Sequence, residues 1–228
     1  MAADEAGRDD WLVRGTTDPR EVAERYDEWA ESYDGDLASW SYQAPGVVAE
    51  AVVTRHPEPR SVLDVGCGTG LVGTALRARG CSARIVGLDI SQASLRVARG
   101  TGAYDVLTPA DLQQPLDVPD GAVDALVCAG VMSYLPDVEA AWREFARVVR
   151  SGGLVVVTQR EDLWEPRACQ DVVDRLAAAG VWTPLDIAGP APYLPRATGG
   201  MAELGCYYLT ARVNADGAGS GALRRRVV

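Results

Sequence analysis

The stretch that decides the fold is Val62-Leu63-Asp64-Val65-Gly66-Cys67-Gly68-Thr69-Gly70, a mostly apolar run that ends in three alternating glycines. A short apolar run of this kind is typical of a buried strand, and the residues after it are suited to a helix. Glycine lets the backbone take left-handed angles and lets a ligand come close, and the first turn of a helix has free N–H groups. The stretch therefore predicts a strand, a ligand-binding loop and a helix, in that order.

From this stretch onward, short β-rich runs alternate with helical runs. We predict strands at 61–65, 84–88, 104–107, 122–128 and 153–158, with a last strand from about Cys206 to Val213. Helices are predicted near 71–79, 91–100 and 138–150, and from Glu165 to about Ala179. This alternation is typical of a mostly parallel sheet with helices on both faces. The predicted fold class is therefore α/β, a Rossmann-like three-layer sandwich.

Ahead of the first strand, the pattern predicts two helices. Asp18-Pro19-Arg20-Glu21 offers a capping acid, a proline at the first helical position and an acid three residues after the cap. A helix should therefore begin near Asp18 and continue to about Tyr33, with Tyr26, Trp29 and Tyr33 on one face. A second helix should follow Ala44-Pro45.

Composition and charge exclude several classes of protein. The 228 residues include 22 basic residues, all arginine, against 32 acidic ones, so the net charge is −10. An acidic surface repels phosphate backbones and anionic lipids, and therefore neither a nucleic acid nor a membrane is an expected partner. The five cysteines fit neither a disulfide framework nor a CxxC metal site, and we expect a reduced, cytoplasmic protein without a metal centre.

The glycine loop can be interpreted in two ways. Residues 68–73 match GxGxxG and an acid, Asp89, follows 21 positions after Gly68, as in a site for a nicotinamide dinucleotide. However, Asp64 at the end of the first strand favours a positively charged ligand over a pyrophosphate. Asp89 can accept hydrogen bonds from ribose hydroxyls, and Asp111 with Leu112 can hold an adenine. These acids favour a site for S-adenosylmethionine.

On these residues the chain resembles the class I S-adenosylmethionine-dependent methyltransferases. The stretch 62–70 is similar to their first motif, 87–91 to their second, and 147–157 to the helix, turn and strand that end their core. The segment 26–34, Tyr-Asp-Glu-Trp-Ala-Glu-Ser-Tyr-Asp, is similar to the lid of a small-molecule subgroup that contains the methyltransferase-like protein 27 type. The resemblance covers roughly residues 20–213.

The resemblance implies a seven-stranded sheet whose last strand is antiparallel, and a helical lid over the cofactor. Residues 1–17 are polar without an apolar period, and 214–228 hold Gly, Ser and three successive arginines, so we expect a flexible leader and a flexible tail around a single domain at 18–213. Within the domain the resemblance implies a lid at 18–59, a cofactor-binding core at 60–159 and a substrate-side part at 160–213. The residues it places at the cofactor are Tyr26, Tyr33, Asp64, Gly66, Cys67, Gly68, Gly70, Leu71, Asp89, Ile90, Asp111, Leu112, Cys128 and Gly130.

The resemblance also implies where catalysis takes place. Many relatives carry a histidine pair after the fourth strand, where this chain has Ser133 and Tyr134, and these two residues with Tyr33 are the catalytic candidates. The one histidine, His56, is expected to have a structural role at a helix end. Aromatic residues near the lid and in the late part of the chain are candidates to line an acceptor pocket: Trp40, Tyr42, Trp182, Tyr193 and Tyr207.

The activity expected from these residues is transfer of a methyl group from S-adenosylmethionine to a small molecule, which leaves S-adenosylhomocysteine. Proximity and orientation supply most of the acceleration in such a reaction, and no metal is expected. Two alternatives stay open: a protein that binds S-adenosylmethionine with lost or different activity, and an NAD-dependent oxidoreductase. The sequence leaves open the acceptor, the atom methylated and the oligomeric state.

Overall fold

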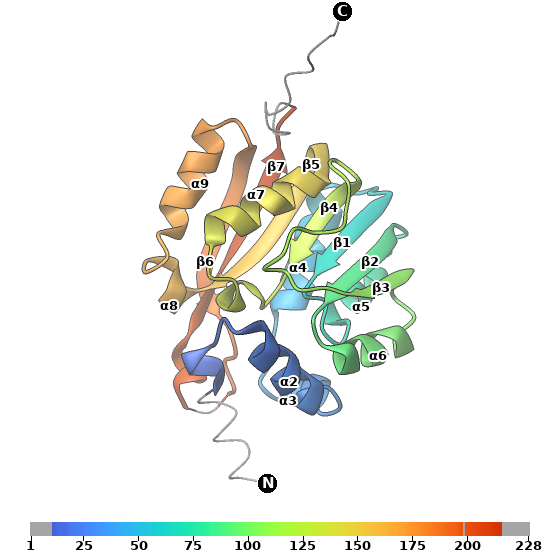
Figure 1. Cartoon of the computed structure of the whole chain (residues 1–228), viewed down its shortest axis with the longest axis vertical. Coiled ribbons are helices and arrows are strands. Elements are labelled where there is room, and N and C mark those ends of the chain that lie inside the picture. The colour runs from blue at the N-terminus through green and yellow to red at the C-terminus, as the bar shows by residue number, and fades with distance from the viewer. Residues whose placement is uncertain (1–10, 198, 216–228) are drawn as a thin grey trace, which may run out of the picture.

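A seven-stranded sheet in the order β3-β2-β1-β4-β5-β7-β6 forms the centre of the computed structural model, which describes residues 11–197 and 199–215 (Figure 1). Its strands are β1 (Ser61–Val65), β2 (Arg84–Asp89), β3 (Val106–Pro109), β4 (Val123–Cys128), β5 (Val149–Arg160), β6 (Trp182–Pro192) and β7 (Gly205–Val213). The first five strands are parallel, and β7 is antiparallel to both of its neighbours, β5 and β6. The predicted sheet with an antiparallel last strand is confirmed.

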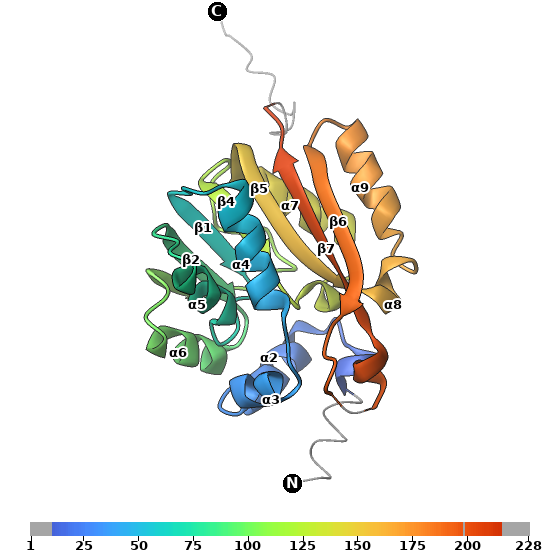
Figure 2. The ribbon, with the colours of Figure 1, turned by 180° about the vertical axis from the view of Figure 1, so that it is seen from behind.

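Helices cover both faces of this sheet (Figure 2). The helices are α2 (Pro19–Trp29), α3 (Tyr33–Ser39), α4 (Ala44–Arg55), α5 (Leu71–Ala78), α6 (Gln92–Gly100), α7 (Val138–Val148), α8 (Glu161–Trp164) and α9 (Cys169–Ala178), with short 3-10 turns at Met132–Tyr134 and Gly199–Glu203. One apolar cluster joins α4 and α5 to the sheet, and a second joins α7 and α9 to its other face. Every residue of β4 is buried between these layers, which explains its apolar sequence.

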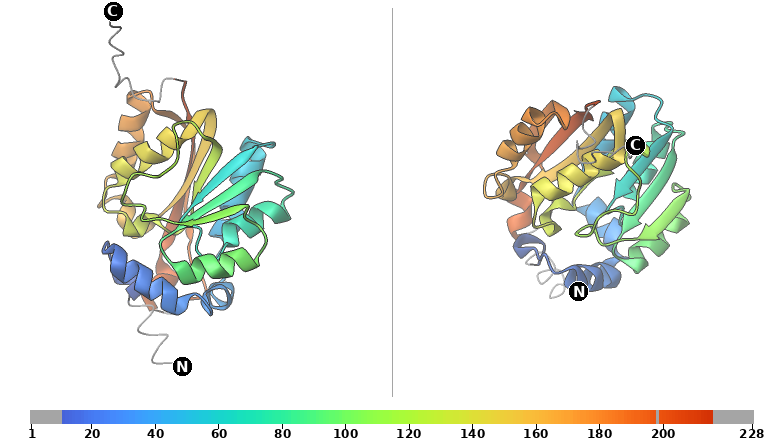
Figure 3. Two further views of the ribbon diagram at one scale, coloured as in Figure 1. Left: turned by 45° about the vertical axis from the view of Figure 1, so that its right-hand side comes forward. Right: turned by 45° about the horizontal axis from the view of Figure 1, so that its top comes forward.

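The N-terminal helices α2 and α3 lie across one end of the sheet, and the C-terminal end of β7 lies at the opposite end (Figures 1 and 3). The two helices cover the carboxyl end of the parallel strands, where the loops after β1 to β4 gather. A third apolar cluster, which includes Trp11, Val22, Trp29 and Leu37, packs the lid against Tyr134 and the segment before β7. The fold therefore places a helical cover over the strand ends, the usual position of ligand sites in open α/β sheets.

The lid differs from the sequence prediction in two places. The first helix ends at Trp29, and a new helix begins at Tyr33 after a turn, so the expected continuous helix is two. Residues 11–14, which we assigned to a flexible leader, form a helical turn, and the side chain of Trp11 is buried. The indole N–H of Trp11 donates to Glu21 at 3.2 Å, and the Thr16 hydroxyl donates to the same carboxylate at 2.8 Å. The ordered part of the domain thus begins before Asp18.

The late part of the chain also differs from the prediction. The proline-containing stretch 182–192, where the residue pattern predicts no strand, is the edge strand β6. Proline cannot donate to a sheet ladder, but an edge strand has a neighbour on only one side and tolerates it. Elsewhere in the sheet the predictions hold within a few residues: the other edge strand, β3, begins at Val106 rather than Tyr104, and β5 begins at Val149 rather than Gly153.

His56 ends the helix α4, as expected. Its N–H donates to the carbonyl of Val52 at 2.8 Å, and its Nε2 lies 3.1 Å from a guanidinium nitrogen of Arg150. These contacts give the only histidine a structural position, and it does not line any of the cavities described below.

Tyr104 packs behind the glycine loop, in a space that a side chain at Gly73 or Gly87 would enter. A Cβ atom added at Gly73 would lie 2.4 Å from the ring of Tyr104, and one added at Gly87 would lie 3.0 Å from it. The Tyr104 hydroxyl accepts from the N–H of Gly73 at 3.0 Å and donates to Oδ2 of Asp64 at 2.6 Å. The ring therefore connects helix α5, strand β2 and the end of strand β1.

We expect Gly73→Ala to lower the free energy of unfolding by about 1–3 kcal/mol, because the added methyl overlaps the Tyr104 ring. Alanine favours a helix more than glycine does, which by itself would raise the free energy of unfolding. A decrease would therefore come from the overlap with Tyr104. Gly100→Ala, at the end of α6 with open space around its Cβ, is the matched control and should change stability by less than about 0.5 kcal/mol. Equal stability of the two variants in denaturant titrations would contradict the packing role of Tyr104.

Candidate functional site

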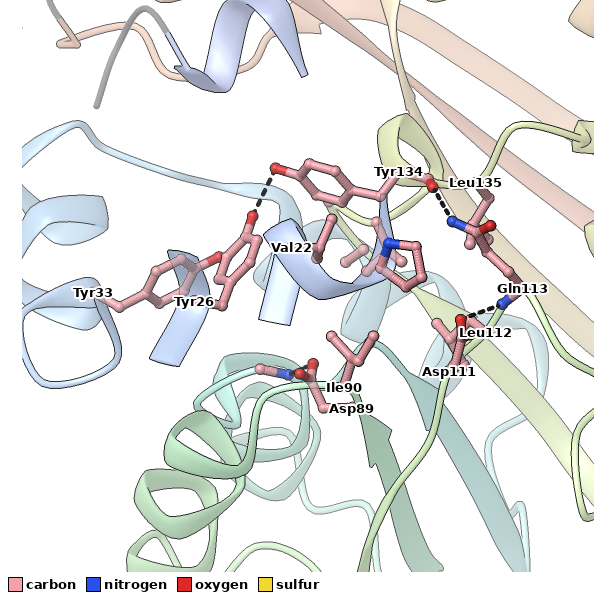
Figure 4. A pocket seen from close by; sticks show the side chains of 16 residues that line it. Val22, Tyr26, Tyr33, Asp89, Ile90, Asp111, Leu112, Gln113, Tyr134 and Leu135 are labelled. Carbon is pink, nitrogen blue, oxygen red and sulfur yellow. Dashed lines mark hydrogen bonds between the residues drawn. The ribbon is translucent and has the colours of Figure 1, made fainter. Parts of the chain in front are cut away.

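A cavity lies between α2 and the loops that follow β1, β2, β3 and β4. It encloses about 610 Å³ of space, part of it open to solvent. Figure 4 shows the side chains that face it. The lining residues are Pro19, Val22, Tyr26, Tyr33, Gly66, Gly68, Asp89, Ile90, Asp111, Leu112, Gln113, Ala129, Gly130, Val131, Tyr134 and Leu135. We call this space the strand-end cavity.

The glycine loop forms one wall of the strand-end cavity. Gly66 has a φ of +71°, and a Cβ there would lie 2.1 Å from the Val131 side chain, so no larger residue fits. The N–H of Gly66 donates to the carbonyl of Leu88 at 2.7 Å and fixes the turn to the end of β2. At Gly68, by contrast, an added Cβ would meet no atom within 4 Å, because this residue faces open space. The loop therefore presents bare backbone to the cavity.

Asp89 closes β2 and lies in the same wall. Its carboxylate accepts from the N–H of Gly68 at 2.7 Å and from the N–H of Ser91 at 2.8 Å. Burial raises the pKa of Asp89 to about 6, although these two hydrogen bonds act in the opposite direction. A carboxylate held in this way has oxygen lone pairs left for hydroxyl donors of a ligand.

Asp64 lies behind the loop and does not line the cavity; its side chain is 1% exposed. Tyr104 donates to its Oδ2, whereas Oδ1 is buried and has no hydrogen-bond partner in the part of the chain that is described. Burial raises the pKa of Asp64 to about 7. A buried carboxylate oxygen without a donor is costly and is frequently a sign of a ligand contact.

The opposite wall comes from the loop after β3. Asp111 accepts from the N–H of Gln113 at 2.9 Å, and Leu112 offers an apolar surface beside it. The amide of Gln113 donates to the carbonyls of Thr17 at 2.7 Å and of Tyr134 at 3.2 Å. Gln113 thus ties this wall both to the chain before α2 and to the turn after β4.

Tyrosine rings form the roof of the cavity. The hydroxyls of Tyr26 and Tyr134 are 2.7 Å apart and hydrogen-bonded, and Trp11 stacks on Tyr134 with ring centroids 5.8 Å apart (Figure 4 shows the tyrosine pair). Tyr33 comes from α3 and lies beside Tyr26, with ring centroids 5.9 Å apart. Burial raises the pKa of all three tyrosines. They are therefore neutral hydroxyls at ordinary pH.

Hydrogen bonds fasten the lid to the loop after each of the first four strands. Asp34 accepts from the Thr69 hydroxyl at 2.5 Å, and Asp27 accepts from the Ser91 hydroxyl at 2.6 Å. The remaining two bonds are those of Gln113 to Thr17 and of Tyr26 to Tyr134. Because all four loops also line the strand-end cavity, the lid and the cavity walls are held together.

A second cavity lies behind the tyrosine roof and encloses about 380 Å³ of space, part of it open to solvent. We call it the tyrosine chamber; its lining is Leu12, Tyr26, Trp29, Tyr33, Leu37, Tyr42, Gly130, Ser133, Tyr134, Arg160, Tyr193, Leu194 and Met201. It shares Tyr26, Tyr33, Gly130 and Tyr134 with the strand-end cavity. The two spaces are therefore separated only by these residues.

Gly130 lies in the wall that the two spaces share. Its φ is +76°, and a Cβ there would lie 2.9 Å from the hydroxyl of Tyr42 and 3.1 Å from that of Tyr193. Both hydroxyls therefore converge on the position where the strand-end cavity and the tyrosine chamber meet. Burial raises the pKa of Tyr42 and of Tyr193, so these groups are also neutral.

The structure brings together most of the residues selected from the sequence. Those that line the strand-end cavity are Tyr26, Tyr33, Gly66, Gly68, Asp89, Ile90, Asp111, Leu112, Gly130 and Tyr134, and Ser133 lines the tyrosine chamber. Those that line neither are Asp64, Cys67, Gly70, Leu71 and Cys128. Both cysteines are buried, and burial raises the pKa of both thiols.

Other residues of the lining were not selected. Val22 lies one helical turn before Tyr26, and this spacing puts both side chains on the same face of α2. The spacing therefore predicts that Val22 lines the same space as Tyr26. The roles of Gln113 and Arg160 depend on long-range contacts.

Among the aromatic candidates, Tyr42 and Tyr193 line the tyrosine chamber, whereas Trp182 packs on Trp142 and Tyr207 packs on Trp164. Trp40 packs on Trp29, behind the chamber wall.

Known proteins resemble the chain in sequence and in fold. A family model described as "Methyltransferase domain" matches residues 63–157. Methyltransferase-like protein 27 of Homo sapiens is 34% identical over 196 residues, which cover 80% of this chain and 76% of that protein. A Thermotoga maritima crystal structure, described as an S-adenosylmethionine-dependent methyltransferase and possible histamine N-methyltransferase, superposes with a TM-score of 0.61 at 14% identity, covering 83% of this chain and 98% of that one.

A further structure with the same fold carries out a different reaction. The [4+2]-cyclase SpnF superposes with a TM-score of 0.57 at 24% identity, covering 74% of this chain and 80% of that one. At such identities the two solved structures show the fold alone.

The sheet order, the glycine loop and the cavity at the strand ends define a class I, Rossmann-like nucleotide-binding fold. The extent and identity of the match to the human protein go further, and the chain belongs to the S-adenosylmethionine-dependent methyltransferase family. Its cofactor is S-adenosylmethionine, with S-adenosylhomocysteine as the product. No helix among residues 11–197 and 199–215 is long and apolar enough to cross a membrane.

The bond between Asp34 and Thr69 makes a prediction about the local stability of the lid. Asp34→Ala removes the acceptor of the Thr69 hydroxyl, and hydrogen bonds to charged groups are worth about 1.5–3 kcal/mol. We expect amide hydrogen exchange in α3 to rise by roughly tenfold, which corresponds to about 1.4 kcal/mol. Glu31→Ala, an exposed position of the same lid, is the control. Identical exchange in both variants would show that the Asp34 bond does not hold the lid.

Proposed function

We propose that the chain transfers the methyl group of S-adenosylmethionine to a small-molecule acceptor held in the tyrosine chamber. The observation that carries the proposal is the shared wall at Gly130, Tyr26, Tyr33 and Tyr134, which puts the two spaces in contact. One space has polar groups suited to a nucleotide, and the other is lined mainly by aromatic and aliphatic side chains. A concave, largely apolar lining of this kind suits a small molecule better than a polymer.

The residues of the strand-end cavity fit the cofactor along its length. Asp89 would accept from the ribose hydroxyls, and Asp111 with Leu112 would hold the adenine. Gly68, where an added Cβ would meet no atom within 4 Å, would leave room for the methionine part, and Gly66 and Gly130 line the same cavity. The unpartnered Oδ1 of Asp64 would accept from the ammonium group, which would supply the donor that this oxygen lacks.

Bound S-adenosylmethionine supplies an activated methyl group on a sulfonium. The protein would then contribute orientation and exclusion of water: the roof made by Tyr26, Tyr33 and Tyr134 would cover the cofactor and would separate the reacting atoms from solvent. The Tyr33 hydroxyl lines both spaces and has no hydrogen-bond partner in the described structure, so it is free to contact either ligand. Tyr33, Ser133 and Tyr134 are the proposed catalytic residues.

The lining of the tyrosine chamber offers no general base. Its tyrosines are neutral because burial raises their pKa, and no histidine, lysine, aspartate or glutamate in the described part of the chain lines this chamber. The acceptor would therefore enter with its nucleophilic lone pair already free. Among the described residues, no group of three or more His, Cys, Asp or Glu side chains is arranged to hold a metal, and we propose a metal-independent reaction.

Calorimetry with S-adenosylhomocysteine and with NAD tests the cofactor, and mass spectrometry of an acceptor panel tests the transfer. We expect micromolar binding of S-adenosylhomocysteine, no binding of NAD, and acceptors whose mass increases by one methyl group. Asp89→Ala should abolish cofactor binding. If S-adenosylhomocysteine binds but no acceptor is methylated, the chain would be a cofactor-binding protein with a different activity, as SpnF illustrates for this fold.

Asp64 gives cofactor binding a dependence on pH. In the free protein its pKa is raised to about 7 by burial, whereas an ammonium group favours the ionised carboxylate. Affinity for S-adenosylhomocysteine should therefore fall as the pH decreases below about 7, approaching tenfold per pH unit. Asp89, with a pKa of about 6, adds to the decrease at lower pH.

Asp64→Asn should bind more weakly at pH 8 and should lose the dependence between pH 7 and 6. Asp117→Asn, at an exposed acid outside both cavities, should keep the wild-type profile. A wild-type profile in Asp64→Asn would refute the contact between Asp64 and the ammonium group.

A further inference from the structure

A third cavity lies outside the tyrosine chamber, next to the chain that precedes α2. It encloses about 500 Å³ of space, part of it open to solvent, and is lined by Val13, Arg14, Gly15, Thr16, Thr17, Ser133, Arg160, Leu163 and Arg167. Ser133 and Arg160 also line the tyrosine chamber. The two cavities are therefore back to back, and we call the outer one the arginine port.

The charge of the arginine port is opposite to that of the whole chain. Three arginines line it and no aspartate or glutamate does, in a protein with a net charge of −10. Arg160 is neutralised, because it donates twice to the carboxylate of Asp162, at 3.0 Å and 2.6 Å. Its other donors bind the carbonyls of Leu12 and Val13. The excess positive charge therefore comes from Arg14 and Arg167.

Neither of these two arginines has a carboxylate partner in the described structure. Arg167 donates to the carbonyls of Met132, Ser133 and Leu135 at 2.7–2.9 Å, and burial without a neutralising partner lowers its pKa. Arg14 is exposed and contributes a second cation to the same cavity.

A purely structural role explains Arg167 but not the whole port. Its three bonds fix the 3-10 turn that carries Ser133 and Tyr134, and a single cation suffices for that. Two arginines without a carboxylate partner give the cavity a positive charge that an anion would balance. The Ser133 hydroxyl, which has no hydrogen-bond partner in the described residues, adds a donor at the inner end of the port.

We propose that the acceptor carries an oxyanion, a carboxylate or a phosphate, that binds at the arginine port beside Arg14 and Arg167. The rest of the acceptor then passes Ser133 into the tyrosine chamber, where the atom to be methylated meets the cofactor. This inference rests on the proposed function and specifies its substrate class. The arginine port would then select acceptors by their charge, which the neutral tyrosine chamber cannot do.

The test is calorimetry on the full chain saturated with S-adenosylhomocysteine, with benzoate, phenyl phosphate and benzamide as probes at low ionic strength. At least one of the two anions should bind ten or more times tighter than benzamide, and added salt should weaken that binding. The tighter anion identifies the oxyanion. Arg14→Gln should weaken anion binding about fivefold and leave S-adenosylhomocysteine binding unchanged.

Two further variants separate recognition from folding. Arg25→Gln makes the same charge change at an exposed position of α2 outside the port and should bind the anions as the wild type does. Arg167→Lys keeps the charge but not the full set of bonds to the turn; it should retain more anion binding than Arg167→Gln, with equal thermal stability of the two.

The results that overturn the inference differ from those that overturn the proposed function. Equal binding of benzoate, phenyl phosphate and benzamide, or equal effects of Arg14→Gln and Arg25→Gln, would overturn the oxyanion site alone. Failure of the wild type to bind S-adenosylhomocysteine would overturn the proposed function, and the inference with it.

Discussion

The turn after β1 must fold back onto the end of β2, and the rest of the site depends on this constraint. The N–H groups of Gly66 and Cys67 both donate to the carbonyl of Leu88, and the next donor along, Gly68, reaches the carboxylate of Asp89. The geometry requires the left-handed φ of Gly66 and leaves no space for a side chain there. It aligns the wall of the strand-end cavity with the start of α5. The lid then adds to this frame, since Asp34 bonds Thr69 in the same turn.

The centre of the fold was predictable because its signals are local. Glycines at required positions, apolar runs for buried strands and the cap before Pro19 each act within a few residues, and the structure follows them closely. The edge strand β6 could not be predicted from its residues because proline normally weakens a strand, and only its place at the edge of the sheet removes that cost. Sequence periodicity carries no information on which strand lies at an edge.

The same distinction applies to the site. Acids at the ends of successive strands could be selected from the sequence because parallel strands bring their carboxyl ends to one edge. The chamber and the port depend on contacts between segments far apart in the chain. Arg160 holds the carbonyls of Leu12 and Val13, more than 140 residues away, and this bond orders a segment that looks like a loose leader in isolation. Burial of Trp11 against Tyr134 has the same origin.

The charge of the lining changes from negative in the strand-end cavity, through neutral in the tyrosine chamber, to positive in the arginine port. The strand-end cavity has Asp89 and Asp111, with Asp64 behind its wall, and suits the cationic cofactor. The tyrosine chamber is neutral, because burial keeps its hydroxyls protonated and Asp162 balances Arg160. The arginine port is positive. On the proposed function, an acceptor with a negative end would be oriented before it reacts: its charge would favour the port and disfavour the acidic wall, so its other end would point toward the cofactor. In a chamber without a general base, such orientation would be the main contribution of the protein to the rate.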